Sequence, residues 1–227
     1  MQSVSAAVPF TNYKLLNYKS VQLPDSTIAQ LAAARGRRLE YLTLGWNAAE
    51  GVAALVSGLL AGSIALVGFG LDSVIEMASA AALLWRLRAE AEPERRERAE
   101  HRARRIVGAC FLALAVYVAF ESIQAVARQE APRETLFGIG VAVAALIVMP
   151  LLAHAKRQVA RRLNSVAMRA DSRQSDFCAY LSAILLAGLL LNALLGWWWA
   201  DPVAALVMTP LIAREGVQGL RGERCSD

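Results

Sequence analysis

The residues of this 227-residue chain whose types and positions best fit a chemical role are acidic side chains inside apolar stretches. Five acids interrupt otherwise hydrophobic segments: Glu50, Asp72, Glu76, Glu121 and Asp176. A charge in the middle of a bilayer costs about 2.5 to 3.5 kcal/mol on insertion scales, so random placement explains these acids poorly. They either bind a cation or form hydrogen bonds and salt bridges between helices.

Asp72 and Glu76, called here the acidic pair, lie four positions apart. This spacing puts both carboxylates on one helical face about one turn apart, where two side chains can grip one ion. Asp72 lies roughly 14 Å from the outer end of its apolar segment, near the midplane of a bilayer. Because neighbouring carboxylates repel, at least one of them holds a proton in an empty site, and a divalent cation would displace it. The pair therefore predicts cation binding linked to proton release.

A second polar stretch runs from Arg169 to Cys178. On a helix Ser172 and Asp176 share one face, whereas Asp171, Ser175 and Cys178 form an adjacent stripe. Either face could supply oxygen or sulfur ligands to an ion held by the acidic pair.

The composition indicates which elements position these residues. Hydrophobic residues make up 56% of the chain, and its mean hydropathy of +0.39 is too high for an ordinary soluble domain. A span of a bilayer takes roughly 20 apolar residues, and backbone groups in lipid must be paired internally, which favours helices. The predicted fold is an all-α integral membrane protein, a bundle of six transmembrane helices at 41–61, 63–85, 106–127, 135–154, 177–197 and 200–213.

Lys and Arg alternate along the chain with the predicted loops. The segment 86–105 holds eight Arg and 154–173 holds one Lys and five Arg, but 127–134 holds only Arg128 and Arg133. The positive-inside rule then places both termini in the cytoplasm. Because this alternation accounts for the net charge of +5, we expect no nucleic-acid partner.

Two further features concern the ends of the predicted spans. The run Trp197 to Trp199 fits an aromatic belt at the outer interface, and Asp201 with Pro202 predicts a helix start with its own cap. The glycine-containing turn at 59–63 favours a tight hairpin of the first two spans.

The expected organisation is a cytosolic N-terminal tail at 1–38, a six-helix domain at 39–215 and a short cytosolic tail at 216–227. No GxxxxGK phosphate loop is present in the sequence, so we expect no ATP hydrolysis. The expected location is a cell membrane, as a multi-pass protein of the bacterial inner-membrane type.

Two stretches carry a resemblance to a known family: AGSIALVGFGLDSVIEMASA and RADSRQSDFCAYLSAILLAGLLLNALLGWWWADPVAAL. They resemble the transmembrane domain of the cation diffusion facilitator family, proton-coupled efflux carriers for zinc and related divalent metals. The resemblance covers roughly 39–215. It places the acidic pair at the family's Asp-xxx-Asp pair and Asp176 at the second residue of its His-xxx-Asp pair.

The sequence departs from that family in three ways. Glu76 replaces an Asp, Ser172 stands where a His is expected, and we expect no C-terminal metal-binding domain. Without the imidazole, an all-oxygen site suits manganese, iron(II) or magnesium better than zinc, although Cys178 or Gln174 could supply a substitute ligand. The predicted metal-site residues are Asp72, Glu76, Asp176, Ser172 and Asp171.

The resemblance implies a secondary transporter that exports a divalent metal cation, zinc or similar, from the cytoplasm in exchange for protons. The metal is then the substrate, no cofactor is expected, and a homodimer is expected from family analogy alone. One alternative is a non-transporting membrane scaffold or metal-sensing subunit. Another is an enzyme, because Gly68 to Asp72 is similar to the Gly-x-Gly-Asp of intramembrane aspartyl proteases; since the Asp is one residue late and no Tyr-Asp partner exists, we expect no enzyme.

Overall fold

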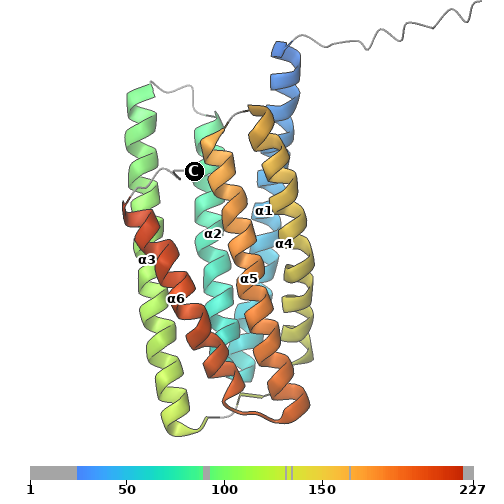
Figure 1. The fold of residues 1–227 in the computed structure, drawn as a ribbon, viewed down its shortest axis with the longest axis vertical. Coiled ribbons are helices and arrows are strands. Elements are labelled where there is room, and N and C mark those ends of the chain that lie inside the picture. Colours follow the sequence, from blue (N-terminus) through green and yellow to red (C-terminus); the bar gives the residue numbers. More distant parts are fainter. Residues whose placement is uncertain (1–24, 89–92, 131, 134, 164, 222–227) are drawn as a thin grey trace, which may run out of the picture.

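The computed structural model describes residues 25–88, 93–130, 132–133, 135–163 and 165–221. Within these residues the secondary structure is helical, and no strand occurs. The helices run alternately up and down in one elongated bundle (Figure 1), which confirms the predicted all-α class. Their bounds are α1 Asp25–Ala61, α2 Ile64–Arg88, α3 Pro93–Arg128, α4 Leu136–Leu163, α5 Val166–Leu195 and α6 Ala200–Arg221.

The described helices α1 to α5 each contain a stretch that is long and apolar enough to cross a membrane. α6 lies in the same bundle but contains no such stretch by this measure. Large apolar side chains cover the outside of the bundle; Leu60, Leu136 and Leu194 are 75%, 84% and 76% exposed. Because a bilayer solvates such a surface and water does not, the chain is a multi-pass membrane protein.

Several helices extend beyond the apolar segments predicted from the sequence. α1 begins at Asp25 instead of near 41, and α4 ends at Leu163 instead of near 154. The stretch 154–173, expected as a loop, consists of two helix ends, with Ser165 accepting the N-terminal hydrogen bond of α5 from the Met168 amide. The prediction failed here because hydropathy detects only the lipid-facing turns, whereas a charged helix continues into water.

The helices pack in pairs, and some of these pairs have close backbone contacts. α1 packs along α2, α4 along α5, and α3 along α6, while α2 also contacts α3, α5 and α6. All six helices contribute to one apolar core, which includes Ala54, Phe69, Phe111, Met149, Leu181 and Met208. Gly108 brings α3 against α6 so closely that a Cβ there would lie 2.7 Å from the Leu220 amide nitrogen.

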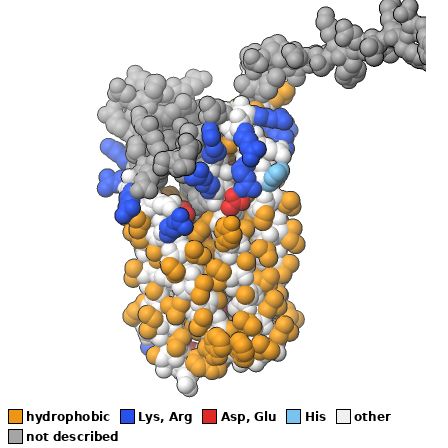
Figure 2. Space-filling view, viewed as in Figure 1, with side chains coloured by type: hydrophobic (Ala, Val, Ile, Leu, Met, Phe, Trp, Pro, Cys, Tyr) orange, Lys and Arg blue, Asp and Glu red, His pale blue; other side chains and the backbone are white. Residues whose placement is uncertain are grey.

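Positive charge gathers at one end of the bundle (Figure 2). We call this the charged end: the start of α1, the end of α2 and the start of α3, the end of α4 and the start of α5, and the end of α6. Described cations here include Arg38, Arg105, Arg162 and Arg173, whereas the opposite end holds Arg128 and Arg133. The alternation of charge along the sequence thus becomes a separation of charge in space.

At the opposite end, α2 and α6 are joined by a polar contact. The α1–α2 turn is tight as predicted: Gly62 has φ +70°, and the Ser63 amide donates to the Gly58 carbonyl at 3.0 Å. Asp201, predicted to cap its own helix, instead accepts from the Ser63 hydroxyl and from the Ile64 amide at 2.9 Å. α6 begins at Ala200, so Asp201 lies in its first turn and caps the neighbouring helix α2.

Candidate metal site

Three buried side chains from two helices converge in the middle of the bundle. Asp72 and Glu76 lie one turn apart on α2, and Cys178 faces them from α5. One ligand atom from each lies within 4.8 Å of the other two. The three residues are 0%, 4% and 0% exposed, so they are shielded from bulk solvent in this conformation.

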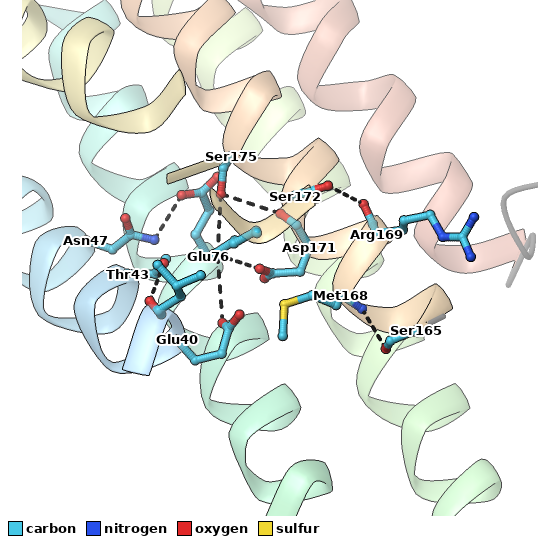
Figure 3. Close-up of polar contacts among 12 residues, drawn as sticks. Glu40, Thr43, Asn47, Glu76, Ser165, Met168, Arg169, Asp171, Ser172 and Ser175 are labelled. Atoms are coloured by element: carbon cyan, nitrogen blue, oxygen red, sulfur yellow. Dashed lines mark hydrogen bonds and ion pairs between the residues drawn. The ribbon is translucent and has the colours of Figure 1, made fainter. Parts of the chain in front are cut away.

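Three of the four carboxylate oxygens of this cluster lack hydrogen-bond partners within the described part of the chain. Neither oxygen of Asp72 has a partner, nor does Oε1 of Glu76. Oε2 of Glu76 accepts a hydrogen bond of 2.9 Å from the Asn47 side-chain amide on α1, and Figure 3 shows the two side chains pointing at each other. Leaving a buried acceptor unsatisfied costs about 1 to 3 kcal/mol, and more if it is charged, so these oxygens fit a bound cation or proton.

The donor set suits a single metal ion. Zinc bonds to carboxylate oxygen at about 2.0 to 2.2 Å and to thiolate sulfur at about 2.3 Å, so tetrahedral ligand atoms lie about 3.4 to 3.8 Å apart. The present upper separation of 4.8 Å exceeds this by about 1 Å, which side-chain rotation can close. Three protein ligands leave a fourth position for water.

A third buried acid lies beside the cluster on α1. Glu50 is 3% exposed, and its Oε2 accepts a hydrogen bond of 3.4 Å from the Ser73 hydroxyl, next to Asp72 in sequence. Its Oε1 has no hydrogen-bond partner among the described residues. Glu50 therefore joins α1 to α2 beside the cluster without supplying a ligand atom to it.

The structure places the other sequence-predicted residues elsewhere. The Asp176 carboxylate is ion-paired with Arg157 of α4, and its side chain is 31% exposed. Ser172 is buried and donates a hydrogen bond of 2.8 Å to the Arg169 carbonyl. The Asp171 carboxylate is ion-paired with Lys156. Neither Asp171 nor Asp176 belongs to the metal-ligand group of the acidic pair.

Sequence reasoning missed Lys156 and Glu40 as members of this polar interior. Lys156 was counted among the loop cations, yet it is completely buried. One signal in the sequence marks it: it continues the buried positions of α4 at helical spacing, after Met149 and Ala153. Arg157 and Arg161 lie off that stripe and are not buried.

Comparisons with known proteins agree with the fold. The model of the cation efflux transmembrane domain matches residues 42–222. A protein of Synechocystis sp. described as an uncharacterized transporter is 28% identical over 174 residues, covering 73% of this chain. The chain spans only 56% of that relative's length. Because the family model covers most of the sequence and includes all three residues of the cluster, the chain belongs to the cation efflux family.

Proposed function

We propose that this protein is a secondary active transporter that exports a divalent metal cation from the cytoplasm in exchange for protons. The observation that carries the proposal is the buried group of Asp72, Glu76 and Cys178. Three of its four carboxylate oxygens lack hydrogen-bond partners among the described residues, and it lies inside a bundle of membrane-spanning helices. Ionisable groups in such places mark ion pathways.

Proton exchange follows from the chemistry of the three ligands. Two carboxyl groups this close cannot both stay ionised without a counter-charge, so the empty site holds at least one proton. A metal ion binds the deprotonated carboxylates and the thiolate, and therefore releases protons. If the cluster opens alternately to each side of the membrane, metal binding on one side and protonation on the other give exchange.

Cys178 supports zinc and similar metals as the substrate class. An all-oxygen ligand set would favour magnesium or manganese, whereas a thiolate favours zinc, cadmium and cobalt(II). The metal is then a transported substrate and not a cofactor. The charged end faces the cytoplasm in this proposal, in agreement with the positive-inside rule.

The test is metal-driven proton movement in liposomes that contain the purified protein and an internal pH-sensitive dye. We expect a proton flux with zinc, cadmium or cobalt(II), and little with magnesium. Asp72→Ala should reduce this flux at least about a hundredfold because a central ligand is lost. Glu130→Gln, at an exposed surface position, is the matched control and should leave the flux unchanged.

Flux that persists in folded Asp72→Ala protein would overturn the proposed site. Tight metal binding by the wild-type protein without any flux would overturn transport and favour a metal-sensing subunit.

A further inference from the structure

A second group of ionisable side chains lies between the metal cluster and the charged end. Lys156 of α4 is ion-paired with Asp171 of α5, and its Nζ lies 3.7 Å from Oε2 of Glu40 on α1. The ammonium also donates a hydrogen bond of 3.4 Å to the Ser175 hydroxyl. In Figure 3 the side chains of Glu40 and Asp171 point toward a common centre.

The stability of the fold does not explain why this charged group is buried. Lys156 and Glu40 are both 0% exposed. Replacing a buried ion pair by well-packed apolar side chains is often neutral or stabilising, so burial of these charges is not explained by stability. Oε1 of Glu40 also lacks a hydrogen-bond partner among the described residues. The group thus contains two carboxyl groups around one ammonium.

Polar side chains connect this group with the metal cluster along two helices. On α1, Thr43 and Asn47 follow Glu40 at spacings of three and four, all are buried, and Asn47 donates to Glu76. On α5, Ser175 lies between Asp171 and Cys178 at the same spacings. Asp171 and Cys178 are about 10 Å apart along the helix axis. A cation that enters from the charged end would meet Glu40 and Asp171 before it reaches Cys178.

We propose that Glu40 and Asp171 form a second divalent-cation site on this approach, in which the ammonium of Lys156 takes the place of the ion until a metal displaces it. The inference rests on the proposed transport function for its role. The site itself is a property of these three side chains. While Lys156 holds the two carboxylates, it blocks the route from the charged end to the metal cluster. An incoming divalent cation opens this route by competing with Lys156 for the two carboxylates.

The first experiment measures bound Cd²⁺ per chain against free Cd²⁺ by equilibrium dialysis of purified protein. Lys156→Met removes the competing ammonium, so its second site should fill at a free Cd²⁺ concentration several-fold lower than the wild type needs. Adding Glu40→Gln to Lys156→Met should remove this second ion, and Lys156→Arg, which keeps the cation, should bind as the wild type does. A folded Lys156→Met protein whose second site fills at the same concentration as that of the wild type overturns the proposal.

The second experiment uses the wild-type chain and so does not depend on how a variant folds. A hydrophobic carbodiimide should join the Lys156 amine to the Asp171 carboxylate as an amide. The water removed in this condensation is taken up by the carbodiimide, which becomes a urea. Saturating Cd²⁺ should lower the yield of this cross-link several-fold by mass spectrometry, because the metal displaces the ammonium. An unchanged yield would overturn the proposal.

The Asp72→Ala variant separates this inference from the proposed function. Its cross-link should still respond to Cd²⁺, because the second site is intact. If Asp72→Ala neither loses a bound metal nor reduces flux, the proposed function fails even where the cross-link responds.

Discussion

At the scale of single residues, the rotation of α5 about its own axis decides which of its side chains face the acidic pair. The sequence left two faces open, and the structure turns the face of Asp171, Ser175 and Cys178 inward. Asp176 lies two positions from Cys178, about 200° around the helix, and is ion-paired with Arg157. No local pattern reveals that partner because it belongs to another helix. The spacing of the acidic pair, in contrast, is a property of one helix and was predictable.

Cys178→Ser tests the role of the thiol in metal selection. The variant replaces a soft sulfur ligand by a hydroxyl of similar size, so cadmium and zinc transport should fall at least about tenfold relative to manganese transport. Metal-dependent proton flux in liposomes measures the ratio. Equal losses for all three metals would show that Cys178 does not select between them.

Asp176→Asn distinguishes the two candidate ligand sets. If Asp72, Glu76 and Cys178 hold the metal, the variant breaks only the pair with Arg157, which is 38% exposed, and should keep at least about half of the flux. A loss as large as that of Asp72→Ala would restore Asp176 as a ligand. Flux per folded protein in the same liposome assay measures the difference.

At the scale of elements, glycines let α3 and α6 touch along their backbones. A Cβ at Gly108 would lie 2.8 Å from the Gly216 carbonyl, and one at Gly216 would lie 2.7 Å from Cγ of Leu112. Small residues at such positions permit helix association in lipid, where apolar surface alone does not drive it. This contact explains how α6 joins the bundle although it contains no stretch long and apolar enough to cross a membrane.

Gly108→Leu should therefore separate α3 from α6 and destabilise the protein. A clash with backbone atoms costs about 1 to 3 kcal/mol or more, so the apparent Tm in detergent should fall by several degrees. Gly45→Leu is the control, because a Cβ there meets nothing within 4 Å. Equal Tm values for the two variants would contradict the close contact.

At the scale of the whole molecule, hydropathy and charge predicted the class and the order of the helices well. Both signals are sums over many residues, so single errors matter little. The helix ends were poorly predicted because charged turns outside the lipid carry no hydropathy signal; Asp25 and Leu163 are examples. The capping of α2 by Asp201 was also missed, since it joins residues more than a hundred positions apart.

The separation of charge predicts the orientation of the bundle in the membrane. A fluorescent protein fused after the last residue should fluoresce in the cytoplasm, because α6 ends at the charged end. Alkaline phosphatase inserted in the α3–α4 connection should be active, because the positive-inside rule predicts that this connection lies outside. The reverse result for both reporters would invert the proposed direction of transport.

The contact of Asp201 with Ser63 and the Ile64 amide has a mechanical consequence. It fastens the first turn of α6 to the start of α2, the helix that carries Asp72 and Glu76. If the α3–α6 pair tilts and this contact is kept, the contact is the fixed point of the rotation. Displacement then grows with distance from this contact and is largest at the charged end, so a small rotation separates the helices there while the opposite end stays closed.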